Sequence, residues 1–401
     1  MKFAVILLSF WMLIPQIEIS GKSKKIASIP FEVVGSYIVI KARINKSSPL
    51  NLILDSGIRS TLITELTAKD SVSLNYSQNV FLKGLGVGNQ LQAFTSTGND
   101  IDIGKIRLQN QSLYVLAEDV FNLSRHTGTK INGLIGSDFF QGHVVEINYD
   151  RRRIVFYEDE GFIAPKKYSP LELDVEGLKM FVHIQVVDPS GHTKTVKMLV
   201  DTGAELAAWF RAYGVSPVAL PKSSIHGFIG QGLNGEITGF IGRIPRIKIG
   251  SAVIFNPVVS FPDSTSIADV FTESQRDGTI GSQILSRFNL IFNEPDNTLY
   301  VRPNARFSDG WSYNIAGIEL VQMDPLLRLS EVLYVWANSP AEKAGVQKGD
   351  RILEVNGKRG FDTDINEIKG MFEVSSKRPM RMILLRGDKT VSVEIDMKSK
   401  L

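Results

Sequence analysis

The chain has 401 residues, of which 43% are hydrophobic and 22% are charged, and its formal net charge is +3. This is a globular composition, long enough for two or three domains, which excludes a disordered or fibrous chain. Lysine and arginine are scattered along the sequence rather than gathered into a basic stripe, so we expect no nucleic-acid partner. The lack of cysteine excludes disulfide bonds and thiol catalysis.

The first predicted element is a signal peptide at residues 1–21. Lys2 precedes an apolar run from Phe3 to Ile14, and Pro15 follows the run. This layout is typical of secretion signals, and the run is too short to span a membrane comfortably. We therefore predict export to the periplasm, the cell envelope or the medium, with no integral membrane span after the signal is removed. An uncleaved anchor or a buried first helix is the alternative.

One long unit then occurs twice along the chain. Its first copy opens with LNLILDSG at residues 50–57 and its second with VKMLVDTG at residues 196–203. A Gly-x-Gly turn starts 29 residues after each aspartate, and the copies continue to NGLIGSDFF at 132–140 and DGTIGSQIL at 277–285. A lone Asp-Ser/Thr-Gly triplet arises readily by chance, whereas two triplets in matched positions indicate an internal repeat.

The segments around both triplets are short, rich in Val, Ile and Phe, and broken by glycine, which is typical of small all-β lobes. We predict a mainly β chain with two pseudo-symmetric lobes followed by a small α+β module. Two similar lobes favour a shared cleft between them. The predicted boundaries are 22–160 for the first lobe, 161–303 for the second lobe, 304–317 for a linker and 318–401 for the module.

The triplets Asp55-Ser56-Gly57 and Asp201-Thr202-Gly203, each followed by a GLIG-like segment, resemble the paired motifs of the pepsin and retropepsin clan of aspartic peptidases. The resemblance covers residues 26–303 and is closest in kind to bacterial retropepsin-like proteins with two lobes and a PDZ domain in one chain. It implies that the triplets meet at a pseudo-twofold axis, supported by segments 133–136 and 278–281, and that Ser56 and Thr202 hydrogen-bond across the lobes. The flap residues that it implies are Gly84, Gly86, Gly230 and Gly232.

The chemistry of peptide hydrolysis explains why paired aspartates are needed. Without a metal or a covalent nucleophile, one carboxylate must take a proton from water and one carboxylic acid must protonate the peptide. Two adjacent carboxyl groups cannot both ionise, so Asp55 and Asp201 would share a proton and supply both roles. Gly57 and Gly203 leave room for the substrate and the opposite backbone. We predict an aspartic endopeptidase that hydrolyses exported polypeptides, with no cofactor and no metal.

Two departures from the clan pattern leave an alternative function open, although the presence of both triplets favours the enzyme. Ile58 and Arg59 follow the first triplet, where pepsins usually carry a small residue, and no tyrosine lies near Gly84, where pepsin flaps have one. The alternative is a catalytically silent pseudo-peptidase that serves as a peptide-binding scaffold, since a fold can persist without its chemistry.

From about residue 318 the pattern changes to strand, short helix, strand, helix and hairpin. SPAEKAGVQKGDRILEVNGK at 339–358 resembles the core of bacterial PDZ domains, and Asp364 is predicted to cap a helix that follows. The resemblance implies that a peptide adds as a strand beside this helix and that its C-terminal carboxylate binds a backbone loop. A module that only packs against the lobes is the alternative. The candidate loop residues are Gly317, Ile318, Glu319 and Leu320.

Overall fold

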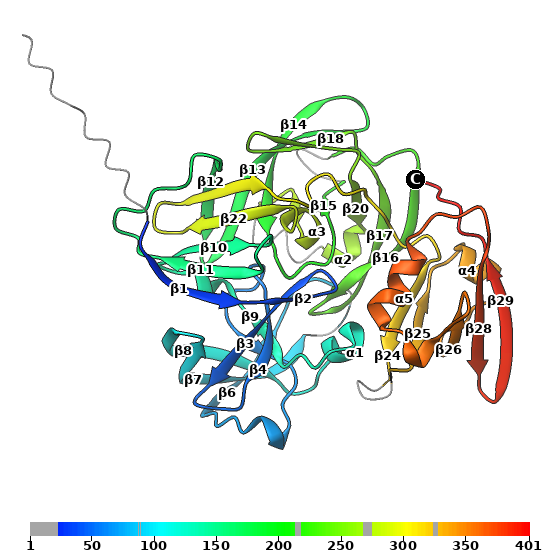
Figure 1. Ribbon diagram of the computed structural model, residues 1–401, viewed down its shortest axis with the longest axis horizontal. Helices are drawn as coiled ribbons and strands as arrows, with labels where there is room; N and C mark the ends of the chain where they lie inside the picture. Colours follow the sequence, from blue (N-terminus) through cyan, green and yellow to red (C-terminus); the bar gives the residue numbers. More distant parts are fainter. Residues whose placement is uncertain (1–22, 87, 89, 213–217, 268–274, 324–327) are drawn as a thin grey trace, which may run out of the picture.

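The computed structural model describes residues 23–86, 88, 90–212, 218–267, 275–323 and 328–401. The predicted signal peptide lies outside the described residues. The described chain consists mainly of strands, arranged as two β lobes and a smaller module at the C-terminal end (Figure 1). The predicted mainly β fold with an α+β module is therefore confirmed. None of the described helices is long and apolar enough to cross a lipid bilayer.

The first lobe is centred on an eight-stranded sheet in the order β2-β3-β4-β9-β5-β8-β7-β6. Its strands follow the expected alternation: in β3, for example, Lys41 and Arg43 are exposed between buried apolar neighbours. The elements of this lobe are β2 (Glu32–Val34), β3 (Tyr37–Ile44), β4 (Leu50–Leu54), β5 (Leu62–Ile63), η1 (Ala68–Asp70), β6 (Tyr76–Leu82), β7 (Leu91–Ile103), β8 (Ile106–Leu116), α1 (Leu123–Thr127), β9 (Gly133–Ile135) and η2 (Ser137–Phe140).

The second lobe repeats the strand order of the first. Its strands follow one another as β12-β13-β14-β21-β15-β20-β17-β16, so each has a counterpart at the same place in the first sheet. The elements of this lobe are β12 (Ser169–Glu176), β13 (Lys179–Val187), β14 (Thr193–Val200), β15 (Ala208–Phe210), β16 (Ser224–Gly232), β17 (Gly235–Arg243), β18 (Arg246–Ile249), β19 (Ala252–Phe255), β20 (Val258–Pro262), α2 (Ser264–Ile267), β21 (Gly278–Ile280) and α3 (Ser282–Leu285).

The repeat is most exact around the two triplets. Strand β4, which ends just before Asp55, pairs in parallel with β9, and β14, which ends just before Asp201, pairs in parallel with β21. A third short strand then runs antiparallel to each partner: β5 pairs with β9, and β15 pairs with β21. Parallel neighbours need a long connection, and here the flap hairpin of each lobe lies within that connection.

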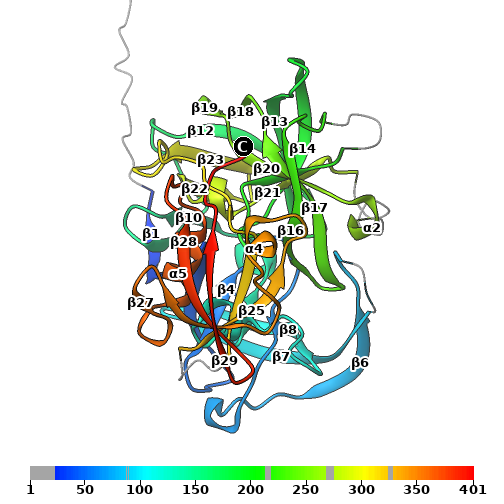
Figure 2. The ribbon, with the colours of Figure 1, turned by 90° about the vertical axis from the view of Figure 1, so that its right-hand side faces the viewer.

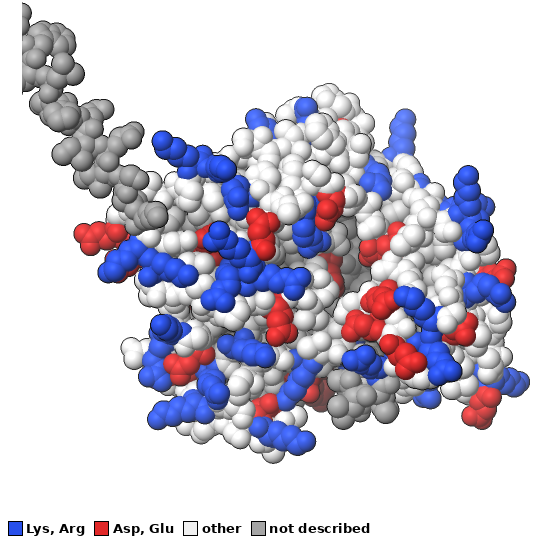
Figure 3. Space-filling model, viewed as in Figure 1, with Lys and Arg blue, Asp and Glu red and all other residues white. Residues whose placement is uncertain are grey.

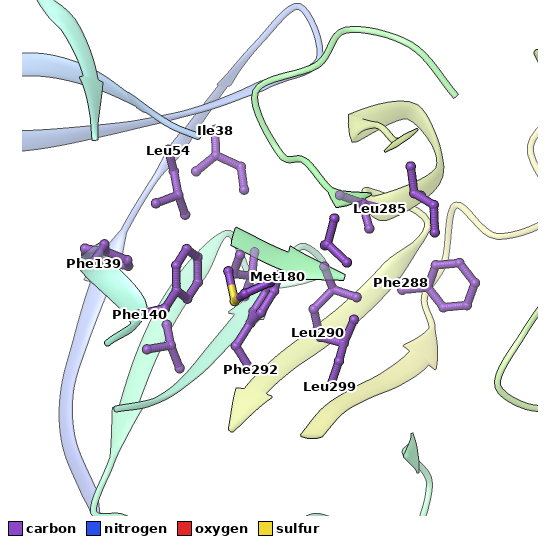
Figure 4. Close-up of a cluster of buried hydrophobic side chains, with 14 of the residues drawn as sticks. Ile38, Leu54, Phe139, Phe140, Met180, Leu285, Phe288, Leu290, Phe292 and Leu299 are labelled. Atoms are coloured by element: carbon purple, nitrogen blue, oxygen red, sulfur yellow. The ribbon is translucent and has the colours of Figure 1, made fainter. Parts of the chain in front are cut away.

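A sheet made from both lobes holds them together. It has the order β1-β11-β10-β22-β23-β12, and β10 of the first lobe pairs antiparallel with β22 of the second. Side chains of both lobes share one core above this sheet, where the Phe140 and Phe292 rings lie 4.5 Å apart (Figure 4). The lobes are therefore fixed relative to each other. The strands added here are β1 (Lys25–Pro30), β10 (Val144–Asn148), β11 (Arg153–Tyr157), β22 (Phe288–Asn293) and β23 (Thr298–Pro303).

The C-terminal module has a sheet in the order β24-β25-β26-β28-β29, with β27 paired to β26. The predicted helix cap is confirmed, because the Asp364 carboxylate accepts a hydrogen bond from Asn366 N at 2.8 Å. The elements of the module are β24 (Ile318–Gln322), β25 (Ser330–Val335), α4 (Pro340–Lys343), β26 (Arg351–Val355), β27 (Lys358–Arg359), η4 (Gly360–Asp362), α5 (Ile365–Phe372), β28 (Met380–Arg386) and β29 (Lys389–Ile395).

The module packs against both lobes (Figure 2). Ile241 and Val258 of the second lobe belong to the same apolar cluster as the interior of the module. The segment 304–317, which we predicted as a linker, wraps around the buried Arg287: this guanidinium donates to four backbone carbonyls between residues 306 and 310 and stacks on Trp311 at 3.7 Å. On the face shown in Figure 3, Lys and Arg are dispersed among Asp and Glu over lobes and module.

Candidate active site

The structure brings the two Asp-Ser/Thr-Gly triplets together between the lobes. Asp55 follows β4, and its N–H donates to Ile135 O of β9 at 2.9 Å. Asp201 follows β14, and its N–H donates to Ile280 O of β21 at 3.0 Å. The glycine-flanked segments that were expected to support the triplets therefore hold both aspartates by equivalent bonds.

Ser56 and Thr202 join the lobes by reciprocal hydrogen bonds. Ser56 N donates to Thr202 Oγ1 at 3.1 Å, and Thr202 N donates to Ser56 Oγ at 3.0 Å. Each hydroxyl then donates to a carbonyl of the opposite lobe, Ser56 Oγ to Val200 O at 2.8 Å and Thr202 Oγ1 to Leu54 O at 2.7 Å. Both side chains are fully buried. This interlock fixes the position of residue 55 relative to residue 201.

Thr202→Val is expected to lower the free energy of unfolding by about 2–4 kcal/mol, because it leaves the buried Ser56 N–H and the Leu54 carbonyl without their partner while keeping the side-chain shape. Thr202→Ser keeps the hydroxyl and serves as the matched control, with an expected cost of about 1 kcal/mol. Urea unfolding measures both variants. Equal midpoints for the wild type and Thr202→Val would contradict the importance of the interlock.

The carboxyl groups of Asp55 and Asp201 face each other between the lobes, close enough for the charge of one to act on the other. Gly57 N donates to Asp55 Oδ1 at 2.8 Å, and Gly203 N donates to Asp201 Oδ1 at 2.9 Å. Neither glycine has room for a side chain: a Cβ on Gly57 would lie 2.4 Å from Asp201 Oδ2, and a Cβ on Gly203 would lie 2.2 Å from Asp55 Cγ. Each glycine therefore faces the carboxyl group of the other lobe. We call the Asp55–Asp201 pair the dyad.

Burial and mutual repulsion keep a proton on the dyad. Burial raises the pKa of Asp55 well above its ordinary value, and the negative charge of Asp201 raises it further. Burial also raises the pKa of Asp201, whereas the positive charge of Arg276 lowers it. Arg276 is itself buried and lies over the Trp209 ring at 5.3 Å. The pair, taken as one unit, therefore retains one proton to a higher pH than an isolated aspartate does.

Tyr37 and Glu205 lie beside the dyad and were not identified from the sequence. The Tyr37 side chain lies close to Glu205, which follows Asp201 by four residues. Burial raises the pKa of Tyr37 well above its ordinary value, and the charges of Glu205 and Asp55 add to this effect. Tyr37 is therefore a neutral hydrogen-bond donor next to the carboxyl groups. Within the described residues, no three His, Asp or Glu side chains gather in an arrangement that could hold a metal ion.

The two candidate flaps meet each other. The first is the connection between β6 and β7, and the second is the β16–β17 hairpin (Figure 1). Gly84 N donates to Asn234 Oδ1 at 3.0 Å, and Asn234 N donates to Leu85 O at 2.8 Å. A Cβ on Gly232 would lie 2.1 Å from Leu85 O, so this glycine permits the contact. Asn234 thus locks one flap to the other.

The remaining candidate flap glycines have different surroundings. Gly86 N donates to Ser266 O of the second lobe at 3.0 Å, so the first flap contacts the second lobe at this point as well. Gly230 lies within β16, and a Cβ added there would meet no atom within 4 Å. The cross-lobe contact therefore involves Gly84, Gly86 and Gly232 but not Gly230.

The two residues that depart from the pepsin pattern support the first triplet through their backbone. Ile58 O accepts from Ser137 Oγ at 2.9 Å, and Arg59 O accepts from Asp138 N at 3.1 Å. The Arg59 guanidinium lies near Gly177, in the turn between β12 and β13. Both residues are thus accommodated beside a triplet that keeps its contacts to the second lobe.

Residues 40–139, which include the first triplet and the segment 133–136, match the family model described as aspartyl protease. The chain therefore contains an aspartyl protease domain. Residues 331–386 match the family model of the PDZ domain, so the C-terminal module is a PDZ domain. These matches confirm the predictions of an aspartic-type hydrolase and of a C-terminal PDZ domain.

Among solved structures, the chain is similar to an aspartic proteinase from Irpex lacteus, with 12% identity over 71% of this chain and 98% of that chain and a TM-score of 0.42. No curated protein matches the chain.

In the PDZ domain, a side chain occupies the start of the candidate carboxylate loop. Asn314 Oδ1 accepts from Gly317 N at 2.9 Å and from Ile318 N at 3.4 Å, and Asn314 Nδ2 donates to Ile318 O. Glu319 accepts from Asn314 Nδ2 and, at 3.1 Å, from Trp336 Nε1. Ile318 and Leu320 point into the domain core. Two of the loop amides are therefore satisfied within the protein itself.

The Glu319 carboxyl group is expected to make folding stability depend on pH. Burial raises its pKa from 4.5 to about 7, and the charge of Glu205 adds to the rise, while Lys369 opposes it. The folded state then binds more protons than the unfolded state between these two values, so the free energy of unfolding falls as the pH rises through this range, by up to about 3 kcal/mol. Urea unfolding at pH 5, 6, 7 and 8 measures this slope, and Glu319→Gln should flatten it. Identical slopes for the wild type and the variant would contradict the assignment.

Proposed function

We propose that this chain is an aspartic endopeptidase in which Asp55 and Asp201 activate a water molecule for the hydrolysis of peptide bonds in exported polypeptides. The observation that carries the proposal is the interlock of Ser56 and Thr202, which holds the Asp55 and Asp201 carboxyl groups side by side. Such an arrangement of carboxyl groups favours a shared proton, which is the state that general acid–base hydrolysis needs.

In the proposed reaction, the ionised carboxylate of the dyad takes a proton from water while the water oxygen forms a bond to the peptide carbonyl carbon. The protonated carboxyl group gives its proton to the carbonyl oxygen, so a neutral tetrahedral diol forms. The dyad then gives a proton to the peptide nitrogen and takes a proton from a diol hydroxyl group, and the C–N bond breaks. The dyad regains its single proton, and one water molecule has been added across the bond.

The surrounding groups support this proton arrangement. The charge of Arg276 favours an ionised carboxylate on the Asp201 side, while burial favours the protonated form of both groups. Two flaps that meet each other are suited to exclude bulk water, which strengthens the hydrogen bonds between the dyad and the reacting groups. Export of the substrates rests on the signal-like residues 1–21.

Incubation of the purified full chain with casein between pH 3 and pH 8, followed by quantification of new amino termini, tests the proposal. We expect cleavage, and we expect its inhibition by a peptide analogue that carries a secondary alcohol in place of the scissile carbonyl, because such a group mimics the tetrahedral intermediate. A lack of cleavage across the whole pH range would contradict the proposal. Cleavage that the analogue leaves unchanged would place the chemistry elsewhere.

A further inference from the structure

The groove of the PDZ domain is occupied by a segment of the first lobe. Helix α1 lies beside β24, the edge strand of the PDZ sheet, and near α5 (Figure 1). Arg125 Nε of α1 donates to Gln322 O of β24 at 3.1 Å. A Cβ on Gly128, just after α1, would lie 2.6 Å from Gln322 Oε1 and 2.8 Å from Ile365 Cγ2 of α5. The end of α1 thus touches both walls of the groove.

Helix α5 also binds the carbonyl groups that α1 leaves free at its end. Asn366 Nδ2 donates to Thr127 O at 3.1 Å, and Lys369 Nζ donates to His126 O at 2.8 Å. The last carbonyls of a helix need such partners because they have no acceptor role within the helix, and a lysine ammonium is favoured at that end of the helix dipole. PDZ domains bind peptides at the edge strand beside this helix, so α1 occupies part of the site where a peptide ligand would bind.

The same domain holds the flap of the second lobe. A Cβ on Gly227 of β16 would lie 2.5 Å from the Trp336 ring, and the Phe228 ring lies 6.1 Å from the Tyr334 ring. Phe228 and Ile229 pack against the apolar cluster of the PDZ domain. Strand β16 leads directly to the flap tip that Asn234 locks to the first lobe. A docked PDZ domain therefore restrains this flap at its base.

A third contact lies beside the dyad. A Cβ on Gly35, in the turn between β2 and β3, would lie 2.9 Å from Glu205 Oε1 and 3.6 Å from Asn366 Oδ1 of the PDZ domain. Glu205 lies close to Tyr37, the neighbour of the dyad. Helix α5 of the PDZ domain thus lies close to the residues that surround the dyad.

We propose that the PDZ domain is an intramolecular lock: its groove takes α1 as a ligand, and the docked domain holds the flaps in a closed state that admits polypeptides poorly. The inference rests on the proposed function. A polypeptide must pass between flaps that are joined through Asn234, and the second flap cannot move as a body while Phe228 and Ile229 stay packed on the domain. Release of α1 from the groove frees the domain and, with it, the flap.

The double variant Asn366→Ala/Lys369→Ala tests the lock, because it removes both donors to the α1 carbonyls while leaving the dyad and the flaps intact. We expect hydrogen–deuterium exchange at residues 123–128 and 318–322 to accelerate, and kcat/KM for casein to rise about tenfold, within the range of known coupling effects. Arg125→Ala removes a contact from the side of the first lobe and should act in the same direction. Glu367→Gln is the matched control on α5, because Glu367 pairs with Lys358 within the PDZ domain, and it should change neither quantity.

Faster hydrogen–deuterium exchange would overturn the lock if casein cleavage stays the same or decreases, because the docking of α1 on the PDZ domain would then have only a structural role. Unchanged exchange in both Asn366→Ala/Lys369→Ala and Arg125→Ala would overturn it as well, since α1 would not be held by the groove. If the double variant does not fold, Arg125→Ala alone decides between these outcomes. Failure of the wild type and of every variant to cleave casein would overturn both the proposed function and the lock, whereas a wild type that cleaves and variants that cleave equally well would overturn the lock alone.

Discussion

Asp55→Asn and Asp201→Asn are each expected to lower kcat for polypeptide hydrolysis by about 10³-fold or more, because general acid and general base catalysis are both lost when one carboxyl group becomes an amide. The one remaining carboxyl group cannot serve as the general acid and as the general base in the same step. The amide keeps the shape of the side chain, so the Ser56–Thr202 interlock should persist. Stopped-time assays on casein with each purified variant measure the effect.

Asp138→Asn is the matched control for these two variants. Asp138 is a third carboxyl group near the first triplet, and burial raises its pKa to about 6. It follows Ser137, which donates to Ser56 O, but it lies outside both triplets. We expect this variant to keep kcat within about a few fold of the wild type, because Asp138 lies outside both triplets and its replacement leaves the acid and the base in place. Activity that survives in Asp55→Asn or Asp201→Asn, or that is lost equally in Asp138→Asn, would contradict the assignment of the dyad.

Gly203→Ala is the second variant with a large expected effect. Its methyl group would lie 2.2 Å from Asp55 Cγ, and no real Cβ sits so close to another heavy atom, so the Asp55 carboxyl group must move. We expect a fall in kcat of about 10²-fold or more, because displacements of about 1 Å have this effect on positioned catalytic groups. The free energy of unfolding should fall by about 1–3 kcal/mol, the usual cost of overpacking.

Gly370→Ala controls for the general effect of the substitution. A Cβ at this exposed position on α5 would meet no atom within 4 Å, and alanine favours helix, so stability should rise by about 0.5–1 kcal/mol and kcat should not change. A Gly203→Ala protein with the activity of the wild type would show that Asp55 does not occupy the position described here.

The repeat made the architecture predictable from sequence. Two strands that end in Asp-Ser/Thr-Gly, each matched to a later glycine-flanked apolar segment, predicted two β lobes, and the structure pairs β4 with β9 and β14 with β21 accordingly. The Asp364 cap was also predictable, because capping depends on residues adjacent in sequence. Such features are local or repeated, and both kinds leave a pattern that periodicity and spacing reveal.

The contacts around the dyad left no such pattern. Tyr37 and Arg276 lie outside both triplets and the segments matched to them, and only the folded chain brings them near the dyad. Glu205 lies four residues after Asp201, yet nothing in that spacing distinguishes a glutamate at the site from one on the surface. The docking of α1 in the PDZ groove depends on backbone carbonyls, which carry no sequence signal. Asn314, which fills part of the carboxylate loop, was missed because its role depends on the turn that brings it back to Gly317.

The pH dependence of kcat/KM for a single short peptide, measured from pH 2 to pH 9 with circular dichroism to monitor folding, tests the shared-proton dyad most directly. We expect a bell-shaped profile with two macroscopic pKa values that belong to the pair, and an alkaline limb above the ordinary range of aspartate, because burial and the adjacent charge raise the pKa of Asp55. In Asp55→Asn and in Asp201→Asn, activity should be lost at every pH, so that neither limb of the profile remains. A profile with a single pKa, or activity that keeps rising into the alkaline range while the protein stays folded, would contradict hydrolysis by a dyad that shares one proton.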